Sequence, residues 1–330
     1  MKHDAPDAII VLGTCPVEVI GDRFETVVDA VSEETQVPMV ALHTSGLKLS
    51  TQQDMLDWCF DTLAGLGEAD KPTSKGGVAL LGMPDDARGS AEVQAALEGT
   101  NLKLIGSFPR GATLDDWKSL PHVDSLLVSD HGMFPTLMSR LNKTVEHITE
   151  TPLPYGLEQT LAVYTLLGQL SGNPLSPHFE SLRDRAQQEI ETFRTKWAGV
   201  RMALGIRMHN SNQFDMVARG GLGHVRMFTE LGLDVTLLIQ GSPDPSMRAV
   251  WTDLLAEHGL DLPFDVFPGP YAVGECLSRG NYQLACVADW MHHQASDTGI
   301  PIIFSHQMRP WLGGVAHNLR YLTRKLEASQ

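Results

Sequence analysis

Cys15 is the residue whose type and position most directly suggest chemistry. It lies in residues 13–22 (GTCPVEVIGD), directly after the apolar run 8–12 (AIIVL), which predicts a strand buried on both faces. A cysteine at an exposed helix start has a lowered thiol pKa, and its thiolate could act as a nucleophile or a metal ligand. A small buried apolar residue is the alternative, because cysteines without a disulfide are usually buried.

Other polar side chains also follow predicted strands. Asp130 and His131 are adjacent at one strand end, where such a pair could do acid–base work, although Asp130 could instead cap a helix. His209 lies in residues 207–212 (RMHNSN), a typical ligand-contact position of α/β folds. Polar, aromatic and glycine residues crowd together in 305–314 (SHQMRPWLGG), which could equally be a loop with a helix-start glycine.

Several common site types find no support in the sequence. The chain has no GxGxxG, GxxxxGK[ST] or GxSxG motif, so an NAD site, a P-loop and a serine-hydrolase elbow are not expected. Four cysteines, at positions 15, 59, 276 and 286, show no CxxC spacing. A disulfide framework or zinc knuckle is therefore not expected, and a reducing cytosol fits.

The elements that must position these residues alternate between short apolar runs and longer amphipathic stretches. This pattern predicts an α/β fold of successive Rossmann-like parallel-sheet domains with helices on both faces. We expect a partial first domain over 1–75, a second over 76–175, and a bridging helix with a third over 176–330. The predicted strands are 8–12, 37–42, 77–82, 102–105, 125–128, 200–205, 234–239, 265–267, 284–288 and 301–304. The predicted helices are 22–35, 51–66, 91–97, 114–120, 134–141, 156–170, 177–197, 213–231, 246–258, 272–279 and 314–326.

Composition excludes several classes of partner. The chain has 330 residues, of which 42% are hydrophobic, so a large core can be buried. Its 25 basic and 40 acidic side chains give a net charge of −15, which argues against nucleic acid and anionic lipid as partners. No apolar run approaches the roughly 20 residues of a membrane span, and the first residues are too polar for a signal peptide. We therefore expect a cytoplasmic protein.

Four segments together resemble the nitrogenase component 1-type oxidoreductases. These include the molybdenum–iron protein subunits, the cofactor-assembly scaffold subunits, and the N and B subunits of dark-operative protochlorophyllide reductase. The segments are 11–22 (VLGTCPVEVIGD), 33–47 (EETQVPMVALHTSGL), 152–170 (PLPYGLEQTLAVYTLLGQL) and 298–322 (TGIPIIFSHQMRPWLGGVAHNLRYL). Residues 113–141 and 309–326 look most like the protochlorophyllide reductase N subunit.

The resemblance implies a redox subunit that works in a complex. Its partners would be a homologous component 1 subunit or a second copy, in a dimer or heterotetramer, and an ATP-dependent iron protein that donates electrons. A 4Fe–4S cluster would lie at the subunit interface, with Cys15 on the family's ligand position and no nucleotide bound by this chain. The family's two upstream cluster cysteines fall in a segment that this sequence lacks, so the other ligands must come from a partner or a missing segment, or else the cluster is absent.

The resemblance also suggests a substrate site without a nitrogenase-type cofactor. The stretch 128–131 lacks the family's second-domain cysteine, and 311–314 lacks its histidine. We expect an organic substrate such as a tetrapyrrole in an apolar cleft. The candidate lining residues are Asp130, His131, Met133, Phe134, His209, His306 and Trp311. The alternatives are a nitrogenase or scaffold subunit, a non-catalytic partner subunit and, less favoured without a signal peptide, a periplasmic-type binding domain.

Overall fold

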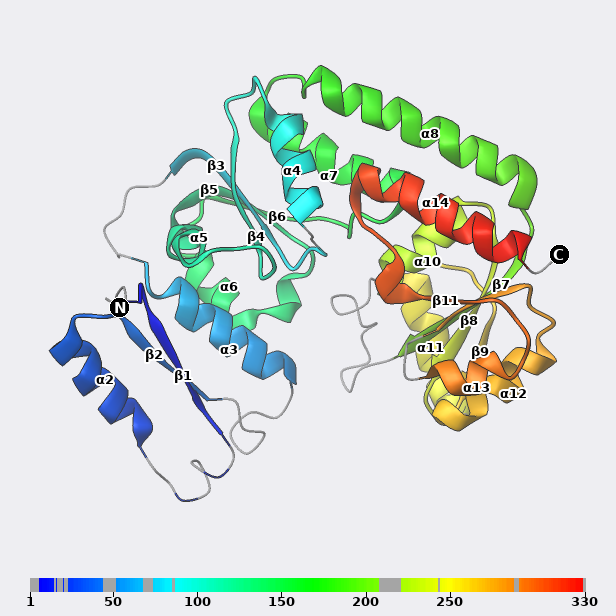
Figure 1. Ribbon diagram of the computed structural model, residues 1–330, viewed down its shortest axis with the longest axis horizontal. Coiled ribbons are helices and arrows are strands. Elements are labelled where there is room, and N and C mark those ends of the chain that lie inside the picture. Colours follow the sequence, from blue (N-terminus) through cyan, green and yellow to red (C-terminus); the bar gives the residue numbers. More distant parts are fainter. Residues whose placement is uncertain are drawn as a thin grey trace, which may run out of the picture. The chain divides into compact units, whose positions relative to one another are not determined.

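The structure is a computed structural model that describes residues 6–14, 16, 20, 23–43, 52–67, 74–84, 87–207, 221–242, 244–287 and 291–328. Helices alternate with three parallel sheets along the described chain (Figure 1). The predicted α/β class is therefore confirmed. The chain forms two compact units. Unit 1 holds Met1–Gly82 and Asn101–Thr151, and unit 2 holds Met83–Thr100 and Pro152–Gln330.

The first sheet belongs to unit 1 and has two strands among the described residues. The parallel strands β1 (Ile9–Gly13) and β2 (Met39–His43) pair in register. The helices α2 (Phe24–Thr35) and α3 (Gln52–Ala64) follow β1 and β2, respectively, along the chain. Alternate side chains of β1, Ile10 and Leu12, are exposed, so one face of this strand stays open to solvent.

The second sheet also belongs to unit 1, with the strand order β4-β3-β5-β6. Its core holds an aromatic group in which the Trp117 ring lies 5.2 Å from Phe60 and 4.8 Å from Phe108. The elements are β3 (Ser74–Leu81), β4 (Lys103–Phe108), α5 (Leu114–Ser119), β5 (Val123–Val128), α6 (Pro135–Leu141) and β6 (His147–Glu150). The order reverses at β3, so ligands are expected beyond the carboxyl ends of its neighbours.

The third sheet belongs to unit 2, with the strand order β11-β10-β7-β8-β9. This is the order of a doubly wound sheet that switches direction between β7 and β10. The strands are β7 (Arg201–Arg207), β8 (Asp234–Gln240), β9 (Phe264–Phe267), β10 (Leu284–Val287) and β11 (Ile302–Phe304). The helices are α10 (Gly221–Glu230), α11 (Pro245–Glu257), α12 (Val273–Arg279) and α13 (His292–Ser296).

Four more helices complete unit 2: α4 (Ala87–Leu97), α7 (Gly156–Ser171), α8 (Pro177–Trp197) and α14 (Trp311–Glu327). Ser176 caps α8 by accepting from the Phe179 N–H, and a proline follows at the first helical position. The helices α8 and α14 lie side by side, joined at one end by a 2.5 Å ion pair between Lys196 and Glu327 (Figure 1).

Most predicted elements are confirmed within a few residues, and α8 agrees at both ends. Of the predicted helix 213–231, the described part is α10; the rest lies outside the described residues. The strand β6 was missed, because its sequence HITE is short and half exposed. The three predicted domain boundaries stay a prediction. In the described part of the chain, no helix is long and apolar enough to cross a bilayer.

Candidate functional site at the ends of β5 and β6

A histidine–carboxylate pair lies beyond the carboxyl ends of two neighbouring strands in unit 1. The Nδ1 atom of His131 is 2.8 Å from Oε2 of Glu150. Both side chains reach solvent, with 43% of His131 and 56% of Glu150 exposed. An ionised carboxylate can only accept, so Nδ1 donates to it, and Nε2 lies on the other side of the ring. Within the described chain Nε2 has no hydrogen-bond partner, which leaves it available to a substrate.

The strand register brings these two residues together. Glu150 ends β6 directly opposite Val128, the last residue of β5. The Thr151 N–H donates to the Val128 carbonyl at 2.9 Å, which extends the pairing past the strand ends. His131 follows Val128 by three residues, so a single tight turn returns its ring to Glu150.

Asp130 shapes that turn. Its Oδ1 accepts from the Gly132 N–H at 2.7 Å, which caps the short 3₁₀ helix η2 (His131–Met133). Before it, the Ser129 hydroxyl donates to the Gly82 carbonyl at 3.0 Å, and the Ser129 side chain is buried. The Asp130 carboxylate therefore binds a backbone N–H of its own loop. The carboxylate that contacts His131 belongs to Glu150.

The other two candidates of this loop pack inward. Phe134 is 1% exposed, and its ring lies 5.5 Å from that of Phe60 in the core of unit 1. Met133 is partly buried against the same core. Both side chains thus anchor the loop that carries His131.

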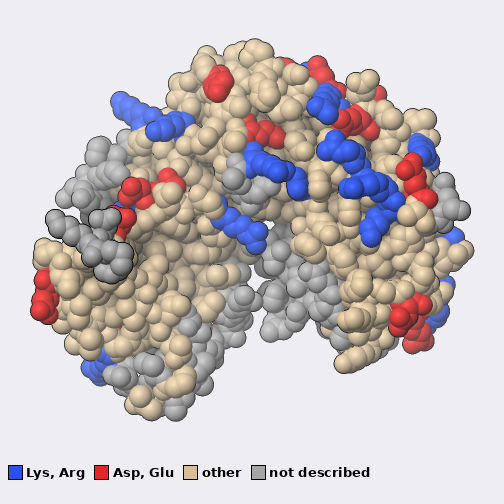
Figure 2. All heavy atoms as spheres, in the orientation of Figure 1, with Lys and Arg blue, Asp and Glu red and all other residues tan. Residues whose placement is uncertain are grey.

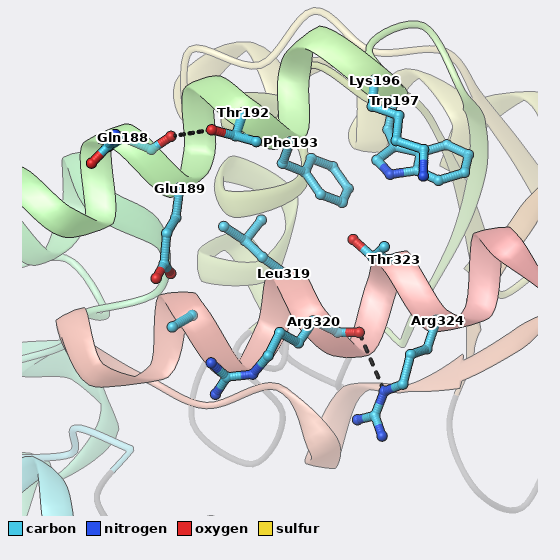
Figure 3. A pocket seen from close by; sticks show the side chains of 11 residues that line it. Gln188, Glu189, Thr192, Phe193, Lys196, Trp197, Leu319, Arg320, Thr323 and Arg324 are labelled. Atoms are coloured by element: carbon cyan, nitrogen blue, oxygen red, sulfur yellow. Dashed lines mark hydrogen bonds between the residues drawn. The ribbon is translucent and has the colours of Figure 1, made fainter.

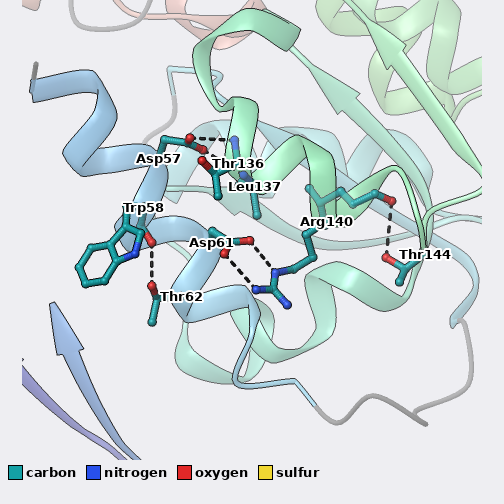
Figure 4. A network of polar contacts seen from close by, with 9 residues as sticks. Asp57, Trp58, Asp61, Thr62, Thr136, Leu137, Arg140 and Thr144 are labelled. Carbon is teal, nitrogen blue, oxygen red and sulfur yellow. Dashed lines mark hydrogen bonds and ion pairs between the residues drawn. The ribbon is translucent and has the colours of Figure 1, made fainter. Parts of the chain in front are cut away.

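Two aspartates of α3 hold α6, the helix that follows this loop (Figure 4). Asp57 is 3% exposed, and its carboxylate accepts from the N–H groups of Thr136 at 2.8 Å and Leu137 at 3.0 Å. Asp61 makes a two-point contact with Arg140, at 2.6 and 2.9 Å, and this hydrogen bonding raises the pKa of Arg140. The start of α6, and with it the loop before it, is therefore fixed from a different helix.

The remaining described candidates belong to unit 2. His306 is exposed and stacks on Phe304, with ring centroids 5.7 Å apart. Trp311 is 1% exposed and begins α14 with φ = +66°, a conformation that a bulky residue rarely adopts. The backbone N–H of Trp311 donates to the Pro154 carbonyl at 2.7 Å. The structure therefore places His306 at the surface and Trp311 in the interior of this unit.

Glu92 secures the start of α14. Its carboxylate accepts from the N–H groups of Leu312 at 3.0 Å and Gly313 at 2.7 Å. The Tyr164 hydroxyl donates to it at 2.8 Å, and burial raises the pKa of this phenol, so it stays a neutral donor. Helix starts in this fold often bind anionic ligands, but this one is occupied by the chain's own acid.

Glu230 acts in the same way at the start of α7. It accepts from the N–H groups of Leu157 and Glu158, both at 2.9 Å. Gly156 is needed beside it, because its φ is +76° and a Cβ atom there would meet the Glu230 carboxylate. None of Asp57, Glu92, Glu150 and Glu230 was a sequence candidate, since each acts on a distant segment.

A sequence comparison identifies the family. The model of the nitrogenase component 1 type oxidoreductases matches residues 1–313. The chain belongs to the nitrogenase component 1 type oxidoreductase family. No curated protein matches it in sequence.

Solved structures support the component 1 fold. The chain is similar to nitrogenase Cp1 at pH 6.5, with a TM-score of 0.73 and 14% identity, over 98% of this chain and 76% of that chain. Against nitrogenase Cp1 at pH 5 the TM-score is 0.72 with 17% identity, over 98% and 71% of the two chains. At these identities the likeness concerns the fold.

The described residues of this component 1 chain do not form a cluster site by themselves. Among them, no group of three His, Cys, Asp or Glu side chains could hold a metal ion. Burial raises the thiol pKa of both Cys59 and Cys276, whereas cluster ligation requires a thiolate. Cys286 is buried in β10. Cys15 and His209 lie outside the described residues, so their predicted roles stay predictions.

Proposed function

We propose that this component 1 chain is a subunit of a nitrogenase-like reductase complex. It receives electrons from an ATP-dependent iron protein and reduces an organic substrate, of which a tetrapyrrole is one example. Cys15 supplies one thiolate to a 4Fe–4S cluster, and a homologous subunit or a second copy supplies the others. A shared cluster agrees with the lack of a metal-binding group among the described residues.

The observation that carries this proposal is the solvent-exposed apolar face of β1, the strand that leads into the Cys15 loop. Parallel strands are normally covered on both faces, and open apolar edges invite pairing. Yet Ile10 is 48% and Leu12 58% exposed on β1, and Val27 of α2 is 61% exposed. Apolar surface beside the cysteine loop favours a partner subunit that covers these exposed side chains.

The pair His131–Glu150 suits the protons of such a reduction. Saturating a double bond consumes two electrons and two protons, and the electrons come from the iron protein. In the protonated ring, Nε2 can donate one proton to the substrate while Glu150 holds Nδ1 and stabilises the positive charge. We assign His131 as a proton donor, with Glu150 as the residue that positions it.

A non-catalytic partner subunit is the second candidate. Such a subunit would keep the component 1 fold for assembly and hold no cluster. The two candidates differ in whether Cys15 holds iron.

The test is anaerobic purification of the natural chain with its component 1 partner, followed by iron analysis and reductive turnover with the iron protein and ATP. We expect iron with a 4Fe–4S spectrum and loss of both iron and turnover in Cys15→Ala, with the complex still assembled. The matched control is Cys59→Ala, which should keep iron and activity.

Replacing Ile10 and Leu12 by lysine tests whether β1 contacts the partner subunit. This variant should lose the partner and the iron together, because charged side chains cannot be buried in an apolar interface. An assembled natural complex that holds no iron would favour the non-catalytic subunit. A complex that persists in the lysine variant would show that β1 is not the interface.

A further inference from the structure

Unit 2 contains a groove between α8 and α14 that the proposed reduction does not use (Figure 3). Its volume is about 750 Å³, within the range of small-molecule sites. Phe193 and Trp197 of α8 and Leu319 of α14 form its floor, each less than 9% exposed. The other lining residues, which define the α8–α14 groove, are Gln188, Glu189, Thr192, Lys196, Ala316, Arg320, Thr323 and Arg324.

Two arginines of this groove have no acidic partner. Arg320 and Arg324 are one turn apart on α14, and neither forms an ion pair within the described residues. The other charged groups at the rim are already paired. Lys196 contacts Glu327 at 2.5 Å, and the Oε1 atom of Glu189 lies 3.0 Å from Arg185.

The two arginines add to a local excess of positive charge on α14. The net charge is −15, yet Figure 2 shows basic side chains gathered over α14. Like charges one turn apart destabilise a helix. Burial and then the positive charge of Arg309, Arg320 and Arg324 lower the pKa of His317 on the same helix. An anion at this place would relieve that repulsion.

We propose that the α8–α14 groove binds a small aromatic carboxylate. The flat apolar body lies on Phe193 and Leu319 beside Trp197, whose ring already has the Lys196 ammonium 4.7 Å from its centroid. The carboxylate lies at the rim between Arg320 and Arg324. A guanidinium group matches a carboxylate with two parallel hydrogen bonds. Thr323, between the two arginines in sequence, adds a hydroxyl at the groove wall.

A small molecule fits the groove better than a protein segment. The apolar floor consists of three side chains, which is enough for one small ring system and far less than a protein interface needs. A stable protein interface needs roughly 800 Å² from each partner. A single flat ring system with one charged group uses both features of the groove, the aromatic floor and the pair of cations.

The test measures binding of anthracene carboxylate to the full chain by calorimetry, with neutral hydroxymethylanthracene as the matched probe. The carboxylate should bind at least ~10-fold more tightly than the neutral probe, because charge-assisted hydrogen bonds add to burial of the rings. The double substitution Arg320→Ala/Arg324→Ala should remove this preference. Lys325→Ala, which removes one charge of the same helix outside the groove lining, should leave it unchanged.

Three results would overturn the proposal. These are equal affinity for the two probes, full carboxylate affinity in the double arginine variant, and self-association through this face. The last is checked by sedimentation of the natural chain and of Ala316→Trp, which fills the groove. A dimer that dissociates in Ala316→Trp would assign the groove to a second copy. Should Ala316→Trp fail to fold, sedimentation of the double arginine variant decides the same question.

Discussion

At the residue scale, His131 and Glu150 form a hydrogen-bonded pair beyond the carboxyl ends of β5 and β6 in the second sheet. The carboxylate holds Nδ1 at 2.8 Å, and the ring nitrogen on the other side stays open to solvent. This is the arrangement by which an acid fixes the tautomer of a proton-transferring histidine.

His131→Gln should lower turnover of the reconstituted complex by ~100-fold or more, which is the usual contribution of a general acid. The substrate KM, the iron content and partner binding should stay close to those of the natural chain, because the residue is 43% exposed and outside the core. Steady-state kinetics with iron analysis measures this.

Glu150→Ala should cost less turnover than His131→Gln, since it changes how the ring is held and keeps the ring itself. Nitrogen NMR of the imidazole should show a larger share of the Nε2–H tautomer in this variant. His147→Gln, at the other end of β6, is the control. Unchanged turnover in His131→Gln would remove His131 from the mechanism.

At the element scale, three of the helices that begin without a side-chain cap of their own are capped from another element. The helices α6, α7 and α14 each receive a carboxylate from another element, namely Asp57, Glu230 and Glu92. These contacts satisfy N–H groups that would otherwise be unpaired, and they favour the positive end of the helix dipole. Long-range caps therefore fix the helix starts next to the candidate site residues.

Asp57→Ala should lower the free energy of unfolding by about 2 kcal/mol, because it removes a buried acceptor from two N–H groups. Asp61→Ala should cost less than about 1 kcal/mol, since its partner Arg140 is 41% exposed. Urea unfolding compares the two variants, and hydrogen exchange at Thr136 and Leu137 locates the effect. Equal decreases of the unfolding free energy in both variants would show that the Asp57 cap does not stabilise the chain more than the Asp61–Arg140 ion pair does.

Glu230 predicts a pH dependence. Burial raises the pKa of its carboxyl above the ordinary 4.5 in the folded chain. The folded state then holds this proton more tightly than the unfolded state, so its contribution to stability is present below 4.5 and is lost as the pH rises through the raised pKa.

The natural chain should therefore lose stability relative to Glu230→Gln as the pH increases above 4.5, by about 1.4 kcal/mol for each unit of raised pKa. Urea unfolding of both chains at several pH values measures the difference. A difference that stays constant with pH, or that increases in favour of the natural chain, would contradict this sign.

At the scale of the whole molecule, the chain combines three parallel sheets in two compact units with a fold of the component 1 type. The first sheet is the least covered among the described elements, with Ile10 and Leu12 exposed on β1. The central strands of the second and third sheets, such as β5 and β10, are almost completely buried. The surface that most needs a partner thus lies next to the loop of the proposed cluster ligand.

The sequence by itself determined the elements and the family. Buried parallel strands are continuous apolar runs, as in β3 and β5, and amphipathic helices such as α8 repeat with the helical period. These signals are local, so they can be read without knowing what each element packs against. The half-exposed strand β6 carries neither signal, and it was missed.

Only the tertiary structure decided which residues act together. The sequence pointed to Asp130 as the partner of His131, whereas the register of β5 and β6 brings Glu150 to it from 19 positions away. Likewise, Glu92 reaches Gly313 across 221 positions. The physical reason is that a hydrogen bond forms only between groups that the fold brings close in space. Strand pairing and helix packing decide which distant segments become neighbours, and the local sequence pattern does not show this.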